Sequence, residues 1–305
     1  MKKHIALVGC GNWGRYILRD LKSLDCNVTV VARSQFSILN AKEYKADTIV
    51  DSIQDIDGEL IDGSIVASPT ATHFTVIQQL LAFGKPVFTE KPMTNSLQSA
   101  QELVTMHSDL LFVMDKWKYH SGIIKIKQMI ESDDFGKVKQ IVLRRNQWSS
   151  PHKDVDPVWI LIPHDISIAQ YLLDQTPEPL FVTANKTKDD YFTSMHATLE
   201  AQDTHIIIEV AGDAVATERS VRIVCEKASF ALPSSNAEHI LLFHHTDAYS
   251  ALPESLPISP NMPLYDELKT FLEFISDSST KLHSTAQQGL ENIQLIHQLR
   301  HLAQG

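Results

Sequence analysis

Three glycines near the N-terminus are spaced to bind a dinucleotide. Gly9, Gly11 and Gly14 follow the apolar run HIALV and precede an amphipathic segment, so the stretch is typical of a strand, a tight turn and a helix. The first glycine permits the turn, the second lets the backbone approach a pyrophosphate, and the third lets the helix pack on the strand. Free N–H groups at the helix N-terminus then face the phosphates. A glycine-rich turn without a ligand is the alternative.

The segment Ala32-Arg33-Ser34 lies where a bound dinucleotide presents its adenosine ribose, directly after a β-branched candidate strand. An acidic residue at this point holds the ribose hydroxyls of NAD, whereas an arginine accommodates the 2′-phosphate of NADP. Because the segment contains Arg33 and no acid, it favours NADP, with NAD possible. A surface arginine in a loop is the alternative.

Lys91 follows the candidate strand 85–89, in the sequence Glu90-Lys91-Pro92. In parallel sheets ligands bind outside the carboxyl ends of the strands, which is where this lysine belongs. A surface lysine paired with Glu90 is the alternative.

Candidate strands and helices alternate along residues 1–118, which predicts an α/β fold with a doubly wound parallel sheet of Rossmann type. Residues 119–305 instead place strands in succession after a helix over 123–130 and an apolar segment over 158–173. This second pattern predicts an α+β domain with a large, open, mostly antiparallel sheet. The candidate strands of the second domain cover residues 138–147, 180–186, 194–201, 205–211, 220–226 and 239–244. A loop punctuated by prolines from 253 to 263 precedes the last helices, over 264–275 and 285–302.

Strands of alternating character, such as 206–208 and 221–224, would leave an apolar patch in water on the sheet face that carries no helices. We therefore expect a homodimer or homotetramer formed through that face.

Composition limits the classes of partner and compartment. The net charge of −10 argues against a nucleic-acid partner, because binding a phosphate backbone needs a basic face. No segment approaches the length of a membrane span. The three cysteines show neither a CxxC motif nor metal-ligand spacing, so we expect no metal, no disulfide and a reducing, cytoplasmic compartment.

Four segments together resemble the Gfo/Idh/MocA oxidoreductases: GCGNWG (9–14), ASPTATH (67–73), EKP (90–92) and PHDIS (163–167). The EKP segment is the most specific of these, because members of the family place it beside the nicotinamide ring. The PHDIS segment resembles a branch of the family that includes predicted sugar and nucleotide-sugar dehydrogenases, and Tyr119-His120 and FGKV (135–138) also fit that branch. The resemblance covers essentially the whole chain and is strong to about residue 170.

The resemblance implies hydride transfer between nicotinamide and a hydroxyl-bearing carbon of a sugar, nucleotide-sugar or cyclitol-like substrate. It places Lys91 nearest the reacting hydroxyl and makes His164 the general acid and base, a role suited to a group that titrates near neutral pH. A satisfied core histidine is the alternative for His164. The implied cofactor contacts are Gly9, Gly11, Asn12, Trp13, Gly14, Arg33, Ser34, Ser68, Pro69, Thr70, His73, Glu90, Lys91 and Pro92. The implied substrate contacts are Lys91, Tyr119, His120 and Asp165.

The chain departs from the family pattern at one position. Many members carry an aspartate four residues before the catalytic histidine, where this chain has Ile160. We expect Asp165, or a water that it holds, to replace that carboxylate. The departure also favours a second hypothesis, a dinucleotide-binding regulatory protein that has lost turnover. A third is a reductase of a non-sugar substrate, such as an imine or a linear tetrapyrrole, which an apolar pocket would support.

Overall fold

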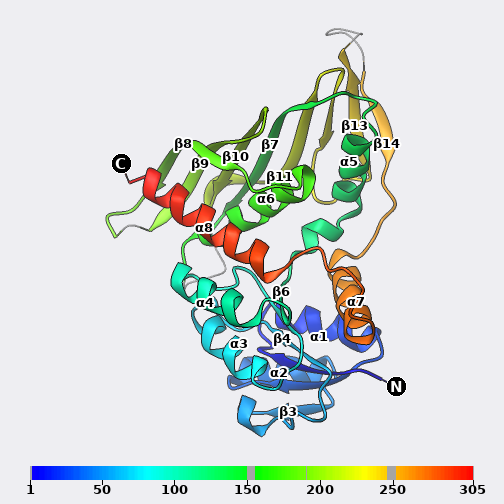
Figure 1. The fold of residues 1–305 in the computed structure, drawn as a ribbon, viewed down its shortest axis with the longest axis vertical. Coiled ribbons are helices and arrows are strands. Elements are labelled where there is room, and N and C mark those ends of the chain that lie inside the picture. The colour runs from blue at the N-terminus through cyan, green and yellow to red at the C-terminus, as the bar shows by residue number, and fades with distance from the viewer. Residues whose placement is uncertain (1, 150–154, 190, 246–251, 305) are drawn as a thin grey trace. The chain divides into compact units, whose positions relative to one another are not determined.

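The structure, a computed structural model, describes residues 2–149, 155–189, 191–245 and 252–304. The chain forms two compact units, each with its own sheet (Figure 1). The first unit comprises Met1–Lys116 and Met262–Ile293, and the second comprises Trp117–Asn261 and Gln294–Gly305. The predicted second domain over 119–305 is continuous, whereas the segment Met262–Ile293 packs with the first unit.

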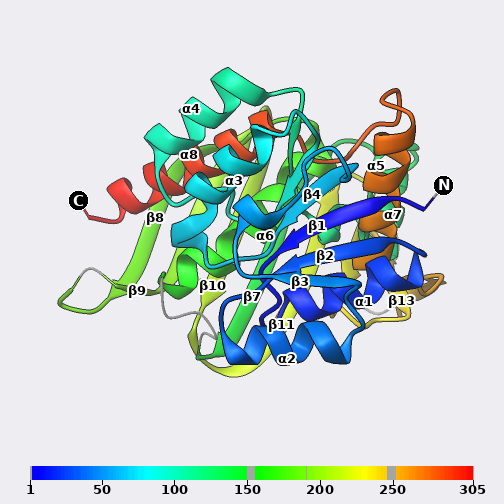
Figure 2. The ribbon, with the colours of Figure 1, turned by 90° about the horizontal axis from the view of Figure 1, so that it is seen from below.

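The first unit contains a six-stranded sheet of order β3-β2-β1-β4-β5-β6, and every neighbouring pair is parallel. This confirms the Rossmann-type prediction. The apolar strand residues are almost all buried, as expected for a sheet with helices on both faces (Figure 2). The strands are β1 (His4–Val8), β2 (Asn27–Val31), β3 (Thr48–Val50), β4 (Gly63–Val66), β5 (Val87–Thr89) and β6 (Leu111–Val113).

Serine side chains cap the N-termini of two helices of this unit. Ser34 Oγ accepts the Ser37 N–H at 3.1 Å, and Ser96 Oγ accepts the Ser99 N–H at 3.3 Å. The helices are α1 (Gly14–Ser23), α2 (Gln35–Glu43), α3 (His73–Leu81), α4 (Leu97–His107) and α7 (Pro263–Ser276), with short turns η1 (Ile53–Asp55) and η2 (Thr70–Thr72). The last helix, α8 (Ala286–Leu302), begins in this unit and ends in the second.

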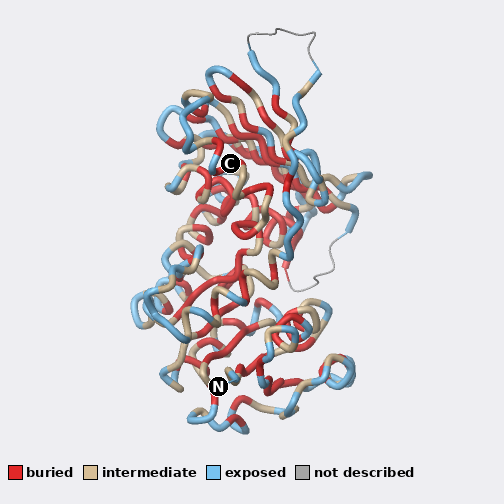
Figure 3. Tube along the Cα trace, turned by 90° about the vertical axis from the view of Figure 1, so that its right-hand side faces the viewer, coloured by how far each residue is buried: buried red, intermediate tan, exposed pale blue. Residues whose placement is uncertain are grey.

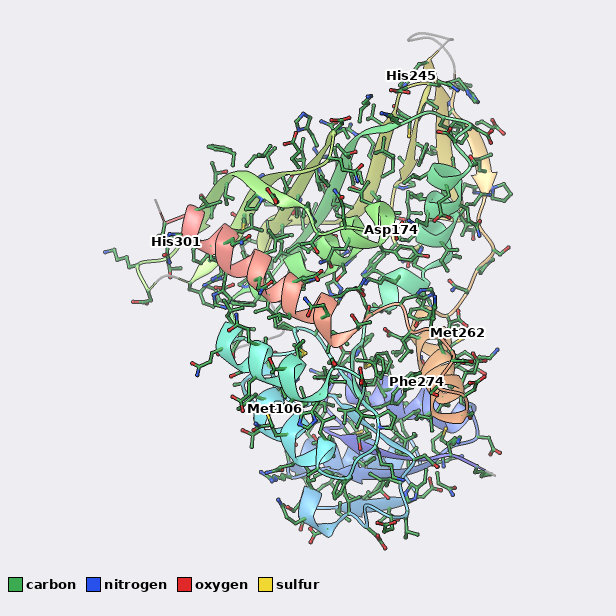
Figure 4. All side chains as sticks on the ribbon, viewed as in Figure 1. Met106, Asp174, His245, Met262, Phe274 and His301 are labelled. Atoms are coloured by element: carbon green, nitrogen blue, oxygen red, sulfur yellow. The ribbon has the colours of Figure 1, made fainter. Side chains whose placement is uncertain are left out.

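Helix α7 belongs to the first unit because aromatic side chains fix it to the parallel sheet. Phe271 stacks on Phe88 of β5 with ring centroids 4.8 Å apart. Phe274, labelled in Figure 4, meets Phe112 of β6 edge-on at 4.6 Å. These pairs bury large apolar surfaces in geometries that aromatic rings prefer. They also carry the neighbouring residues of α7 toward the carboxyl ends of β5 and β6.

The second unit contains an eight-stranded sheet of order β14-β13-β12-β11-β7-β10-β9-β8. Its neighbours are antiparallel except for the pair β7 and β10, so the predicted mostly antiparallel sheet is confirmed. Buried positions are frequent in the central strands β7, β9 and β10, whereas the edge strands β8 and β14 are mostly exposed or half-buried (burial is coloured in Figure 3). The strands are β7 (Val138–Trp148), β8 (Glu178–Lys186), β9 (Phe192–Ala201), β10 (Thr204–Ala211), β11 (Asp213–Cys225), β12 (Ala228–Leu232), β13 (His239–His244) and β14 (Glu254–Pro257).

Two strands of this sheet were not predicted. The five-residue strand β12 pairs with β11 and β13, and its apolar positions are too few to be distinctive in the sequence. Strand β14 lies in the segment predicted as a proline-rich loop. It pairs only with β13, at the edge of the sheet, where proline is tolerated because half of the backbone groups need no ladder partner.

Helix α6 (Pro157–Leu173) packs on β7, β9 and β10, while α5 (Ser121–Glu131) follows the turn η3 (Lys116–Tyr119). Asp156 caps α6 by accepting the Trp159 N–H at 3.2 Å, and Pro157 occupies its first turn, where no N–H is needed. The helix ends at Asp174, which adopts a left-handed conformation and pairs with Lys127 of α5 (Figure 4). None of the helices in the described residues is both long enough and apolar enough to cross a membrane.

Candidate functional site

The glycine-rich turn connects β1 to α1 and packs closely on the end of β4. Gly9 has a φ of +96°, and a Cβ there would lie 2.6 Å from the Ala67 carbonyl oxygen. A Cβ on Gly14 would lie 2.2 Å from the Gly9 carbonyl oxygen, so both positions exclude a side chain. A Cβ on Gly11 would meet nothing within 4 Å. The turn therefore presents open backbone at Gly11, where a pyrophosphate could approach.

The N-terminus of α1 retains its capacity to bind an anion. Trp13 occupies the N-cap position without a side-chain hydrogen bond to the helix, and Asn12 is exposed beside it. The first turn of α1 contains no acidic residue. The positive end of the helix dipole suits a phosphate at this position. The residues of the turn thus fit the dinucleotide that the motif predicts.

Arg33 and Ser34 follow β2 at the edge where an adenosine ribose would bind. The Arg33 side chain is exposed, and its Nε donates to the Asp51 carbonyl oxygen at 3.1 Å. Ser34 is the N-cap of α2, so its hydroxyl already accepts a backbone N–H. Of the two, Arg33 is the side chain that could turn toward a 2′-phosphate.

The segment after β4 is fixed to the segment after β5 by one histidine. His73 is 1% exposed, and its ring nitrogens lie 2.9 Å from the carbonyl oxygens of Ser68 and Pro92. A carbonyl oxygen only accepts, so the imidazole can donate to both at once only when it is doubly protonated. His73 therefore joins two loops of the predicted cofactor site. Pro69 is exposed and Thr70 is buried within the first of these loops.

Glu90 occupies the position between the glycine-rich turn and Lys91. Its carboxylate accepts from Trp13 Nε1 and, at 3.2 Å, from the Lys91 N–H. Burial raises the pKa of Glu90, although these two donors and the nearby cations oppose the shift. Lys116 Nζ lies 4.5 Å from the centre of the Trp13 ring. The carboxylate thus fixes the indole of the glycine-rich turn to the EKP segment.

Lys91 forms a buried ion pair with Asp115. The Lys91 Nζ donates to Asp115 Oδ1 at 2.7 Å, with side chains only 8% and 3% exposed. The peptide bond that follows, Lys91–Pro92, is cis. A carboxylate at this distance fixes the position of the Nζ atom through a charge-assisted hydrogen bond. The pair can therefore present a positioned cation to a ligand.

Glu267 of α7 contacts Asp115, the acidic member of this ion pair. One oxygen of its carboxyl group, Oε1, accepts the backbone N–H of Asp115. The other, Oε2, is buried and has no hydrogen-bond partner among the described residues. Burial, together with repulsion from Glu90 and Asp115, raises the pKa of Glu267 well above its ordinary value of 4.5. A neutral Glu267 fits this environment.

Sequence reasoning missed Asp115 and Glu267. A signal for Asp115 existed, because it follows strand 111–113 just as Lys91 follows strand 87–89. Thr89 is opposite Val113 in the parallel register, so the residues two positions beyond each are also neighbours. Glu267 gave no such signal, since it lies 152 residues from Asp115 in an amphipathic helix.

The second unit holds His164 and Asp165 on α6. Asp165 is 1% exposed and accepts from Arg145 Nη2 at 2.8 Å and from Arg145 Nε at 3.2 Å. Arg145 also lies over the Trp117 ring, 4.6 Å from its centre. His164 is partly exposed, one residue before this ion pair. Ile160, one turn earlier on the helix, supplies no carboxylate.

Tyr119 and His120 lie in and directly after the turn η3 that precedes α5. His120 Nδ1 accepts the Gly122 N–H at 3.1 Å, and Nε2 donates to the Ser235 carbonyl oxygen at 3.0 Å. These two contacts select the neutral tautomer protonated on Nε2. Tyr119 is buried, and its carbonyl oxygen accepts from Asn261. His120 thus caps a helix, and the predicted substrate contacts of both residues stay predictions.

Two family models match the chain. The oxidoreductase family with an NAD-binding Rossmann fold, Gfo/Idh/MocA, matches residues 3–110, and the GFO/IDH/MocA C-terminal domain matches residues 123–231. The chain belongs to the Gfo/Idh/MocA oxidoreductase family. The resemblance predicted from four short motifs is thereby confirmed.

This Gfo/Idh/MocA chain is 27% identical over 186 residues to an inositol 2-dehydrogenase of Agrobacterium fabrum, a match covering 57% of this chain and 55% of that relative. It is 25% identical over 220 residues to an inositol 2-dehydrogenase of Acidiphilium cryptum, covering 68% and 63% of the two chains. The matched region therefore spans between half and two thirds of the length of these relatives.

Solved structures share the fold of this family member over nearly the whole chain. One is a UDP-N-acetylglucosamine 3-dehydrogenase from Acidithiobacillus ferrooxidans, with a TM-score of 0.83, 18% identity and coverage of 99% and 98%. Another is an oxidoreductase from Agrobacterium radiobacter in complex with NAD+, L-tartaric acid and magnesium, with a TM-score of 0.85, 14% identity and coverage of 100% and 97%. At these identities the likeness establishes the fold.

Proposed function

We propose that this Gfo/Idh/MocA member is an NAD(P)-dependent oxidoreductase that acts on a hydroxyl-bearing carbon of a sugar, nucleotide-sugar or cyclitol. The observation that carries the proposal is the buried ion pair, at the carboxyl ends of β5 and β6, between Asp115 and the lysine of the EKP segment, Lys91. The names of the inositol 2-dehydrogenase relatives and of the nucleotide-sugar dehydrogenase with the same fold support the substrate class.

The dinucleotide would be held by the first unit. The open backbone at Gly11 and the N-terminus of α1 suit its pyrophosphate, and the loops joined by His73 suit its nicotinamide end. When bound, the nicotinamide would supply a hydride acceptor or donor. We further propose NADP as the preferred form, because Arg33 is exposed where the 2′-phosphate would lie and no acid replaces it.

Lys91 would stabilise negative charge on the reacting oxygen. Removing hydride from an alcohol carbon requires the hydroxyl proton to leave, and the oxygen carries negative charge while it does so. An ammonium group fixed by Asp115 can donate a hydrogen bond to that oxygen without first reorganising. His164 would take the proton in one direction and return it in the other. This assignment requires both side chains to reach one substrate.

The test begins with the cofactor. Quenching of intrinsic tryptophan fluorescence by NADPH and by NADH measures whether the chain binds a dinucleotide and which form it prefers. A panel of cyclitols, free sugars and nucleotide sugars, assayed by nicotinamide absorbance, then tests turnover. Failure to bind either nucleotide would end the proposal.

A second candidate function is a dinucleotide-binding regulatory protein. Ile160 favours it, because the carboxylate that many family members carry there is missing, while Asp165 is engaged by Arg145. Such a protein would bind the dinucleotide with the same residues and show no turnover with any substrate of the panel.

A further inference from the structure

The sheet of the second unit holds two arginines side by side. Arg145 on β7 and Arg219 on β11 are directly opposite each other in the antiparallel register, so their side chains leave the same face. This is also the face that α6 covers, because Arg145 contacts Asp165 of that helix. The neighbouring residue along β7 on this face is Gln147, whose Oε1 accepts from Arg219 Nη2 at 2.7 Å.

The carboxylate of Asp165 is bonded to Arg145, and Arg219 lies beside this pair. Arg145, which is 3% exposed, engages both oxygens of Asp165 through its Nε and also uses its Nη2. Arg219 is partly exposed and makes no ion pair within the described residues. Burial and the neighbouring Arg145 lower the pKa of Arg219, and Asp165 offsets this only in part. Within the described residues, this pair of arginines therefore forms an ion pair with one carboxylate, that of Asp165, and it does so through Arg145.

We infer that Arg219 binds an anionic group of the substrate, a carboxylate or a phosphate, beside the turn of α6 that carries His164. That the anion belongs to a substrate rests on the proposed function, whereas the anion site itself is argued from the arginine pair. It distinguishes between the substrate classes named above: uronates, sugar phosphates and nucleotide sugars carry such a group, whereas free sugars and inositol do not.

The chemistry of the site suits an oxyanion more than a neutral hydroxyl. A guanidinium presents parallel N–H donors that match two oxygens of a carboxylate or phosphate. The amide of Gln147 adds a polar group next to Arg219, and Trp117 under Arg145 provides an aromatic wall. An anion at Arg219 would relieve the repulsion between the two arginines, so binding would be stronger than at an isolated surface arginine.

The position relative to α6 follows from Asp165. Asp165 contacts Arg145, which is directly opposite Arg219, and His164 precedes Asp165 in the same turn of α6. A substrate bound through its anionic group at Arg219 would therefore lie beside the turn of α6 that carries His164.

The test measures binding rather than turnover. Glucuronate, glucose 1-phosphate and glucose are titrated into the full chain, with and without NADPH, and affinity is measured by calorimetry. We expect at least one of the two anions to bind and glucose to bind more than tenfold more weakly. The glucuronate and glucose 1-phosphate arms distinguish a carboxylate from a phosphate.

Variants then assign the site. Arg219→Gln should weaken anion binding by about 10- to 100-fold, the effect of one charge-assisted hydrogen-bonded contact. Arg219→Lys keeps the charge but loses the two parallel N–H donors of the guanidinium, so its affinity for the anion should lie between those of Arg219→Gln and the unchanged chain. Arg222→Gln is the matched control, since Arg222 is exposed on the opposite face of the same strand. It should bind the anion like the unchanged chain.

Equal affinity for glucose and both anions, no binding of either anion, or undiminished binding in Arg219→Gln would each overturn the inference. Because none of these measurements needs catalysis, they fail independently of the oxidoreductase proposal. If Arg219→Gln does not fold, the Arg219→Lys affinity decides, and a value equal to that of the unchanged chain counts against the site.

Discussion

Lys91 and Asp115 are joined by a 2.7 Å hydrogen bond although 24 residues separate them, because they extend two adjacent parallel strands by the same number of residues. The pairing of the two strands therefore brings the two charged side chains together. The ammonium group is buried with its counter-ion, and the backbone of Asp115 is in turn held by Glu267.

Asp115→Asn should lower kcat by on the order of 10²-fold, the effect of a misplaced catalytic group, with a smaller change in KM. The amide keeps the shape of the side chain but lacks the negative charge that holds Lys91 Nζ in its present position. Steady-state rates for the two chains measure kcat and KM separately. Asp174→Asn, which removes one acidic partner of Lys127 in the other unit, is the matched control and should leave both constants unchanged.

Lys91→Ala should abolish turnover while changing dinucleotide affinity by no more than a few-fold. His164→Ala should lower kcat by on the order of 10²–10⁴, the range for a positioned acid or base. Turnover assays beside fluorescence titrations with NADPH measure the two effects separately. A His164→Ala chain with unchanged kcat would remove the histidine from the mechanism.

Glu267→Gln should make the stability of the chain less dependent on pH. The pKa of Glu267 is raised in the folded state, so between pH 4.5 and that higher value the folded chain binds one more proton than the unfolded chain. The contribution of Glu267 to stability is thus fully present below pH 4.5 and falls as pH rises toward the folded-state pKa, by at most about 1.4 kcal/mol per pH unit. Glutamine keeps an oxygen for the Asp115 N–H and carries no charge, so the variant should gain stability relative to the unchanged chain as pH rises. Urea unfolding from pH 4 to 8 tests this; parallel curves for the two chains would contradict it.

Arg33→Ala should weaken NADPH binding and leave NADH binding nearly unchanged. A charge-assisted contact with the 2′-phosphate contributes about 1.5–3 kcal/mol, which corresponds to roughly 10- to 100-fold in affinity. Fluorescence titration with both nucleotides measures the ratio. Equal losses for the two, or tighter NADH binding by the unchanged chain, would show that Arg33 does not select NADP.

The chain should associate through the sheet face of the second unit that faces away from α6. Along β10, Ile206 and Ile208 are buried on the face that α6 covers. The residues between and beside them, His205, Ile207 and Glu209, lie on the opposite face, where Ile207 is partly exposed. Pairing with another copy would cover such apolar positions. Light scattering at micromolar concentration should give the mass of a dimer or tetramer; a monomer would refute this expectation.

The sequence predicted the parallel sheet well because its signals are local. The glycine-rich turn, the buried β-branched strands and the intervening helices each lie within a short window, and their order fixes the topology. The edge strand β14 was missed because prolines at 253 and 257 usually mark loops, and only pairing with β13 makes this segment a strand.

The site was predicted incompletely because its charges come together from distant segments. The position of Lys91 follows from a strand end, but its partnership with Asp115 depends on which strands are neighbours. The sequence made Asp165 a candidate to replace the carboxylate missing at position 160. In the structure Asp165 binds Arg145, a residue on another element that no spacing rule connects to it.

The three positions of the first turn have glycine for different reasons. Side chains at positions 9 and 14 would strike the backbone, so folding by itself requires glycine there, whereas position 11 has empty space above it. A Gly11→Ala chain should therefore fold normally and lose affinity only for the dinucleotide. In a descendant that no longer bound a nucleotide, natural selection for a folded chain would keep positions 9 and 14 and leave position 11 free to drift. Residue 11 is thus where such a loss would first leave its mark in the sequence.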